Sequence, residues 1–304
     1  MLYDNKEKIA YVRLDNRVYE KNVEKYIRYF RKMCIKSKPE YIDIGLIIDV
    51  PEYKKYNQWI KKRIFEQVSS YIKEYNIDYI VFDNDLEFIM NNFDETKVLN
   101  GKLLMKGLII EILNYIFEVN NKNMSLENIY VFVNQYTKSN IHIIKKLVEK
   151  FKTVNIITEN LKYYKRLENL LYDEGILITV SNNIRKSARN AKYIINIDFC
   201  KELFENYNIN IDSLIINLTD EVVLFEKKFG GVLVNNFEVR VDEDSAKFIE
   251  EFYGNIDKKI YLESILCTGK QYYEKAGDLF KQYNGKIRNL TGIRGVLQKC
   301  EFLM

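Results

Sequence analysis

The chain has 304 residues, of which 47% are hydrophobic and 30% charged, and its 12 glycines and 2 prolines are too few for a disordered, linker-rich or collagen-like protein. Its net charge of +4 is spread along the chain, which argues against a nucleic-acid-binding protein. No uncharged apolar run approaches about 18 residues and the start lacks the apolar core of a signal peptide, so we expect a cytoplasmic protein without membrane insertion.

Hydrophobic periodicity over the first third of the chain predicts alternating strands and helices. Strands are expected over 8–14, 42–50 and 78–85, and helices over 16–36 and 51–75. The second helix repeats an apolar residue every four positions, at Ile60, Ile64, Val68 and Ile72. Strands this hydrophobic are typical of a sheet covered by helices on both faces. We therefore predict an N-terminal α/β domain over residues 1–100.

A second run of alternating elements follows an apolar helix predicted over 102–119. Strands are expected over 129–134, 154–160, 176–182, 193–199 and 213–220, with helices over 139–151 and 161–172 and a short helix that ends at 190. Alternation this regular favours a doubly wound parallel sheet, because parallel strands need crossover connections. We assign this domain to residues 101–220.

The pattern changes in the last part of the chain, residues 221–304. Residues 221–244 alternate between apolar and polar side chains and contain Gly230-Gly231, which predicts a β-hairpin. A helix near 245–253, a strand-like segment over 258–266 and further helices are expected after it. We predict that this hairpin and helical region packs back on the N-terminal domain. The hairpin edge suits strand addition, which predicts a homodimer or another protein partner.

Polar side chains end each strand of the second predicted sheet. In a parallel sheet these ends share one edge, where open α/β proteins bind ligands at the point where the strand order reverses. Polar strand ends also arise simply because loops meet water, and this alternative stays open. The candidate ligand-binding residues are Asn134, Thr137, Lys138, Ser139, Glu159, Asn160, Asn182, Asn196 and Asp198.

Within this set, residues 137–139 precede and open a predicted helix. Hydroxyl groups, the lysine ammonium and free backbone N–H groups at such a position can hold an anion. The alternative is that Ser139 or Asn140 simply caps the helix.

Histidine and cysteine limit the available chemistry. His142, the single histidine, lies in the same helix and needs a carboxylate partner such as Glu159 or Asp198 to act as a base. A structural role for His142 is the favoured alternative. The four cysteines form no C-x-x-C pair, so we predict no metal site and assign no catalytic residue.

Over about residues 100–220 the layout resembles Rossmann-type two-domain proteins of the shikimate-dehydrogenase and amino-acid-dehydrogenase group. The segment NGKLLMKGLIIEIL at 100–113 lies where such proteins enter a linker helix. Glu159 ends the second strand, where the family uses an acidic residue to hold the adenosine ribose. The resemblance implies two α/β domains, the second a Rossmann-like doubly wound parallel sheet, and NAD or NADP as cofactor.

The loop after the first strand of that domain departs from the family pattern. Dinucleotide folds place G-x-G-x-x-G there so that the backbone can approach the pyrophosphate, whereas residues 134–140 read NQYTKSN. We expect Tyr136 to occupy the space that a pyrophosphate needs, and we predict no cofactor.

The sequence thus favours a non-catalytic or regulatory Rossmann-like protein that acts as a binding or scaffold module, with a pocket for a small polar or anionic ligand. The alternative is an atypical NAD(P)-dependent oxidoreductase or a nucleotide-dependent transferase that works from the strand ends.

Overall fold

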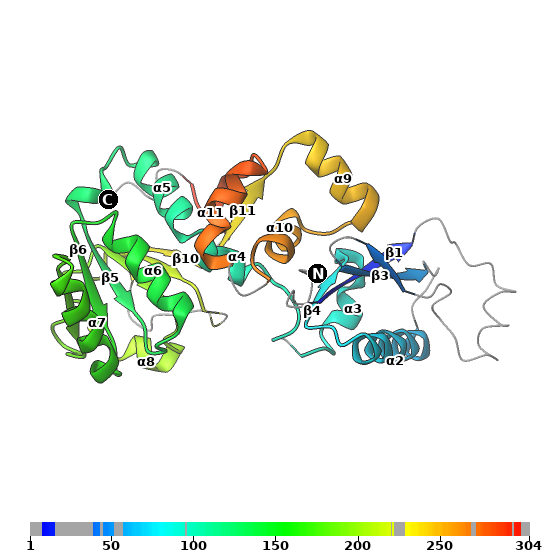
Figure 1. The fold of residues 1–304 in the computed structure, drawn as a ribbon, viewed down its shortest axis with the longest axis horizontal. Coiled ribbons are helices and arrows are strands. Elements are labelled where there is room, and N and C mark those ends of the chain that lie inside the picture. The colour runs from blue at the N-terminus through cyan, green and yellow to red at the C-terminus, as the bar shows by residue number, and fades with distance from the viewer. Residues whose placement is uncertain are drawn as a thin grey trace, which may run out of the picture. The chain divides into compact units, whose positions relative to one another are not determined.

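A computed structural model describes residues 8–15, 39–42, 45–51, 57–94, 96–219, 221, 229–268, 272–293 and 295–298. The chain divides into two compact units. Unit 1 contains residues 1–104, 241–272 and 279–285, and unit 2 contains residues 105–240, 273–278 and 286–304. Each unit has its own parallel sheet (Figure 1). The helix predicted over 16–36 lies outside the described residues.

The sheet of unit 1 is parallel apart from one edge strand. Strands β3 (Gly45–Pro51), β1 (Ile9–Asp15) and β4 (Tyr79–Phe82) lie side by side in parallel, and β2 (Glu40–Ile42) pairs antiparallel with β3. Helix α2 (Gln58–Glu74) buries its predicted apolar stripe in the core of this unit. The sequence therefore located both the strands and the buried face of this helix.

Unit 1 also contains η1 (Asn84–Leu86) and α3 (Glu87–Met90), which follow β4. It further contains two helices from the last part of the chain, α9 (Glu243–Tyr253) and α10 (Lys258–Leu266). Segment 258–266 was predicted to be strand-like, and this prediction is wrong because it forms α10. A short apolar run does not by itself distinguish a strand from a buried helix, and most side chains of α10 are buried.

The buried carboxylate of Glu263 in α10 caps helix α4 (Lys102–Gly107). It accepts hydrogen bonds from the backbone N–H groups of Gly101 (2.7 Å) and Leu103 (2.7 Å). Burial raises the pKa of this carboxyl group, and these N–H donors partly offset the effect. The helix predicted over 102–119 is two helices, α4 and α5 (Ile109–Val119), since the chain leaves the helical path at Leu108.

Unit 2 contains a six-stranded sheet in which every neighbouring pair is parallel. Its strands are β5 (Asn128–Phe132), β6 (Thr153–Ile157), β7 (Ile178–Ser181), β8 (Tyr193–Asn196), β9 (Leu214–Asn217) and β10 (Val232–Val234). Across the sheet they run β7-β6-β5-β8-β9-β10, which is the 3-2-1-4-5-6 order of dinucleotide-binding Rossmann domains. The predicted Rossmann-like doubly wound sheet is confirmed.

The helices of unit 2 connect neighbouring strands. Helix α6 (Lys138–Val148) joins β5 to β6, α7 (Leu161–Asp173) joins β6 to β7, and α8 (Lys201–Glu205) lies between β8 and β9 (Figure 1). Right-handed crossovers place α6 and α7 on the same face of the sheet. The short helix predicted to end at 190 is absent from the described residues, where 184–190 form turns.

The first strand of the hairpin predicted around Gly230-Gly231 falls on residues 222–228, which lie outside the described part. Residues 232–234 form β10, which pairs in parallel with β9. A Cβ on Gly231 would lie 2.1 Å from the backbone oxygen of Ser213, so glycine is needed for close approach to the neighbouring chain segment and not for a hairpin turn.

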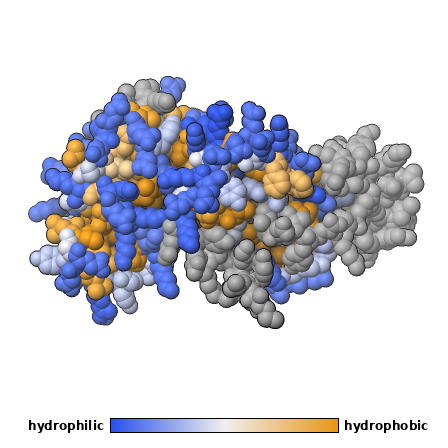
Figure 2. Space-filling model, turned by 45° about the horizontal axis from the view of Figure 1, so that its top comes forward, coloured by the Kyte–Doolittle hydropathy of each residue, from blue (hydrophilic) through white to orange (hydrophobic). Residues whose placement is uncertain are grey.

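A small antiparallel sheet completes unit 2. It contains β11 (Asn236–Arg240), β12 (Lys286–Gly292) and β13 (Gly295–Val296), and its β12–β13 pair is the hairpin of the C-terminal region. Helix α11 (Tyr272–Gln282) precedes β12. Among the described residues no helix is both long enough and apolar enough to cross a membrane. On the face drawn in Figure 2, apolar side chains form separate patches among hydrophilic ones.

Candidate functional site

The predicted site lies at the carboxyl edge of the six-stranded sheet, where β5 and β8 are neighbours. The chain leaves β5 toward one side of the sheet and β8 toward the other, so this is the point where the strand order reverses. Open α/β proteins bind ligands in the crevice at such a point. Asn134 follows β5 and Asp198 follows β8, so both lie at this position.

The carboxylate of Asp198 occupies the loop between β5 and α6. Its Oδ1 accepts the backbone N–H of Asn134 (2.6 Å), and its Oδ2 accepts the backbone N–H of Gln135 (2.9 Å). The side-chain amide of Asn140 donates to the same Oδ2 (3.0 Å) and to the backbone oxygen of Gln135 (2.9 Å). One carboxylate and one amide therefore hold the loop that replaces the glycine-rich segment of dinucleotide folds.

Two opposing influences act on the pKa of Asp198. Burial raises the pKa of the carboxyl group from its usual value of 3.8. The N–H groups of Asn134 and Gln135, the positive charge of Lys106 and the amide of Asn140 oppose this rise without cancelling it. Ionisation of this carboxyl group therefore costs solvation energy, although the three hydrogen-bond donors stabilise the charged form.

Helix α6 begins one residue earlier than predicted. Its N-cap is Thr137, whose hydroxyl accepts the backbone N–H of Asn140 (3.2 Å). The alternative that Ser139 or Asn140 caps the helix is therefore wrong, because Ser139 lies within its first turn and Asn140 is buried beneath the loop. The side chain of Lys138 is exposed and that of Ser139 is half-buried.

Tyr136 points onto helix α7. Its ring centroid lies 5.5 Å from that of Tyr163 and 5.4 Å from that of Tyr164. The hydroxyl of Tyr164 donates to the backbone oxygen of Gln135 (2.9 Å), and burial raises the pKa of this hydroxyl. The ring of Tyr136 therefore packs on α7, while Asp198 takes the backbone donors of the loop.

The side chain of Asn134 joins this loop to the end of β6. Its Oδ1 accepts the backbone N–H of Glu159 (2.8 Å) and faces the hydroxyl of Thr158 at 3.3 Å. The amide of Asn160 lies 3.4 Å from the backbone oxygen of Asn134. These polar side chains therefore hold two neighbouring strand ends together.

Glu159 is exposed but has a buried partner. Its Oε1 accepts a hydrogen bond from the hydroxyl of Tyr207 at 2.5 Å. Burial, with the nearby carboxylate of Glu159 as a second cause, raises the pKa of Tyr207. Tyr207 packs its ring edge-on against Phe132, at 5.3 Å between centroids, within the core under β5.

Asn196 lies fully buried at the end of β8. Its amide donates to the backbone oxygen of Phe199 (3.1 Å) and to Oδ1 of Asn217 (3.0 Å), while its own Oδ1 accepts the backbone N–H of Phe199 (3.0 Å). Asn217 in turn donates to the backbone oxygen of Glu221 (2.7 Å). Both asparagines are 0% exposed, so their polar groups are committed to the protein.

The structure thus brings most of the candidate residues to one edge. Asn134, Asn160, Glu159 and Asp198 lie in one connected set of contacts, and Thr137, Lys138 and Ser139 lie at the adjoining helix start. Asn196 lies beneath this edge and faces the core. Asn182 is exposed after β7, the outermost strand, and does not join the set.

Three residues with structural roles at this edge were outside the predicted set. They are Asn140, Tyr207 and Asn217. Asn217 ends its strand, as the other candidates do, so its position at a strand end could have identified it from the sequence. Tyr207 lies 48 residues from its partner Glu159, and no sequence pattern links the two.

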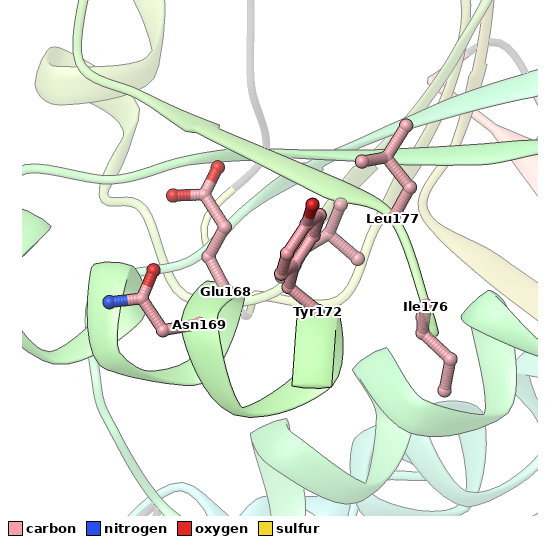
Figure 3. Close-up of a pocket in the computed structure, with 6 residues that line it drawn as sticks. Glu168, Asn169, Tyr172, Ile176 and Leu177 are labelled. Carbon is pink, nitrogen blue, oxygen red and sulfur yellow. The ribbon is translucent and has the colours of Figure 1, made fainter. Parts of the chain in front are cut away.

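A pocket of about 290 Å³ lies at the opposite end of the sheet from this edge. It lies between α7 and the start of β7, and Figure 3 shows the ring of Tyr172 beside the chain segment that carries Leu177. Its lining is Glu168, Asn169, Tyr172, Ile176, Leu177 and Ile178. Among the described residues, no group of three or more His, Cys, Asp or Glu side chains is placed to hold a metal ion.

Comparison with known proteins gives similarity only at the level of fold. No protein-family model matches the sequence, and no curated protein sequence matches it. L-tryptophan dehydrogenase from Nostoc punctiforme is 9% identical with a TM-score of 0.31, over 91% of this chain and 88% of that chain. Ornithine transcarbamoylase from Giardia lamblia is 8% identical with a TM-score of 0.31, over 86% of each chain.

A chorismate mutase/shikimate 5-dehydrogenase fusion protein from Clostridium acetobutylicum is 14% identical with a TM-score of 0.30, over 90% of this chain and 99% of that chain. The expected likeness to two-domain Rossmann-type proteins is confirmed as a weak structural resemblance, which also extends to transcarbamoylases. Similarity this low concerns the fold alone and does not indicate which activity this chain has.

Proposed function

We propose that this protein is a non-catalytic or regulatory binding module on a Rossmann-like scaffold, which binds a protein partner or a small polar ligand instead of a dinucleotide. The observation that carries the proposal is the hydrogen bonding of Asp198 to the N–H groups of Asn134 and Gln135. In dinucleotide-binding domains the pyrophosphate lies against this loop and the helix that follows. Here a carboxylate of the protein uses two of these donors and would repel the diphosphate.

The remaining polar side chains support the same proposal. Asn134, Asn196 and Asn217 hold strand ends and loops together through hydrogen bonds to the protein itself. A buried amide that left these partners to contact a substrate would leave buried polar groups unpaired, at a cost of about 1–3 kcal/mol each. An edge built in this way suits a rigid scaffold better than a reaction centre.

The alternative is an atypical NAD(P)-dependent oxidoreductase or a nucleotide-dependent transferase, and one observation favours it. Glu159 is exposed at the end of β6, the second strand of the 3-2-1-4-5-6 order, where dinucleotide domains place the acidic residue that binds ribose hydroxyls. Tyr207 holds one of its carboxylate oxygens in place.

Thermal unfolding of the full chain with and without ligands separates the two functions. NAD, NADP, mononucleotides and S-adenosylmethionine are tested one at a time, because a ligand at 100 times its Kd stabilises the folded state by about 2.7 kcal/mol. We expect no change in Tm with either dinucleotide. A rise in Tm that is lost in Glu159→Ala would contradict the binding-module proposal and support the enzyme.

A further inference from the structure

Strand β7 is an edge strand, with β6 on one side and no described strand on the other. The backbone N–H of Thr158 donates to the backbone oxygen of Ser181 (3.0 Å), so Ser181 directs its backbone groups toward β6. Backbone direction alternates along a strand, and the N–H and C=O groups of Ile178 and Val180 therefore point outward. Although Ile178 is 3% and Val180 7% exposed, an edge strand whose backbone groups face away from its sheet is a template for another strand.

Two large apolar side chains lie beside this open edge. Tyr172 at the end of α7 is 68% exposed, and Leu177 just before β7 is 63% exposed. With Ile176 and Ile178 they line the pocket drawn in Figure 3. Isolated exposed apolar residues need no explanation, but these two lie together at a strand that lacks a neighbour.

The edge also carries opposite charges at its two ends. Asp173 and Glu174 precede β7, and Arg185 and Lys186 follow it. All four side chains are exposed, and none forms an ion pair with another residue in the described ranges. The start of the edge is therefore acidic and its end basic.

We propose that two copies of this chain associate through β7, antiparallel about a two-fold axis, so that their two sheets become continuous. A two-fold axis brings a surface against its own reversed image. The acidic end of each copy then faces the basic end of the other, a self-complementary pattern that an unrelated strand would not match.

The backbone geometry suits this arrangement. With the axis beside Thr179, Ile178 of each copy lies opposite Val180 of the other, and both residues direct their N–H and C=O groups across the new contact. Tyr172 and Leu177 flank the joined strands and lose exposed apolar surface. The inference deepens the proposed binding function, because it names the partner as a second copy.

Sedimentation velocity on the full chain at several concentrations tests the proposal. The wild type is expected to be a dimer that dissociates on dilution and at high salt, because salt screens charges at an exposed interface. Asp173→Lys/Glu174→Lys makes both ends basic, and Arg185→Glu/Lys186→Glu makes both ends acidic. Each double variant alone is expected to raise the dimer Kd by about tenfold or more.

An equimolar mixture of the two double variants is the decisive sample. Every basic end then meets an acidic end, and the dimer is expected to re-form as a heterodimer. Because all four positions are exposed, the variants should fold, and circular dichroism checks this. Glu149→Lys, on an exposed side chain beyond α6, is the control and should leave the dimer unchanged.

Three results would overturn the pairing: a wild-type chain that stays monomeric at all concentrations, double variants that dimerise as the wild type does, or a mixture that stays monomeric. None of them bears on dinucleotide binding. A Tm shift with NAD or NADP would instead overturn the proposed function, whatever the oligomeric state.

Discussion

At the scale of single residues, Asp198 determines how the polar edge of this Rossmann-like sheet is hydrogen-bonded. It connects the end of β8 to the loop after β5 through the backbone N–H groups of Asn134 and Gln135, with Asn140 as a third donor. A charged acceptor with three donors contributes more than an ordinary hydrogen bond. The loop should therefore depend on this carboxylate.

Asp198→Ala removes the acceptor of these three hydrogen bonds. We expect the free energy of unfolding to fall by about 1–3 kcal/mol, because the partly buried donors lose their partner. Urea denaturation followed by circular dichroism measures this change. The control is Asp212→Ala, an exposed aspartate of the same unit, which should change stability by no more than about 0.5 kcal/mol. Equal losses in the two variants would count against the assigned role of Asp198.

The raised pKa of Asp198 predicts how its contribution depends on pH. The unfolded chain ionises near the usual pKa of 3.8, whereas the folded chain holds the proton to higher pH. In the window between these two pKa values the folded state binds more protons, so stability falls as pH rises. The stability difference between wild type and Asp198→Ala should therefore be larger below the usual pKa than at neutral pH. If the stability difference between the two proteins grew with pH, the hydrogen bonds would lower the pKa of Asp198 by more than burial raises it, and the raised pKa would be wrong.

At the scale of elements, helix α6 shows how one capping residue positions the site. Thr137 accepts the N–H of Asn140, which fixes the first turn and leaves the amide of Asn140 directed at Asp198. The sequence placed the helix correctly but chose the wrong capping residue, because Thr137, Ser139 and Asn140 all have cap-forming side chains. Only the path of the loop distinguishes them.

Thr137→Ala should therefore cost about 1 kcal/mol of stability, as loss of an N-cap usually does. Ser139→Ala is the matched control, two residues further along the chain. It should be close to neutral because the hydroxyl of Ser139 does not cap the helix. Chemical denaturation of both variants measures the difference. If Ser139→Ala proved the more damaging change, the cap assignment would be wrong.

At the scale of the whole molecule, periodicity and strand ends in the sequence were enough to predict two α/β sheets and the edge that carries the polar residues. The last part of the chain was harder to predict. Residues 258–266 form a short apolar segment whose partner, the N-terminus of α4, lies about 160 residues away in sequence. Local pattern therefore gave the state of α10 wrongly.

The candidate site was predictable in position but not in its internal pairing. Strand ends of a parallel sheet meet by topology, so Asn134, Glu159 and Asp198 could be placed together from sequence. That Asp198 would bind the β5–α6 loop, and that Tyr207 would hold Glu159, depends on the path of two loops with no sequence signature. Through these contacts the polar side chains of this edge are hydrogen-bonded to the protein itself.

Calorimetric titration of NAD and NADH into the full wild-type chain shows whether the edge around Asp198 binds a dinucleotide. We expect no saturable heat of binding with either form, because Asp198 already uses the backbone donors that a pyrophosphate requires. A saturable isotherm with one site per chain, weakened in Glu159→Ala, would contradict it and show that this edge binds a dinucleotide.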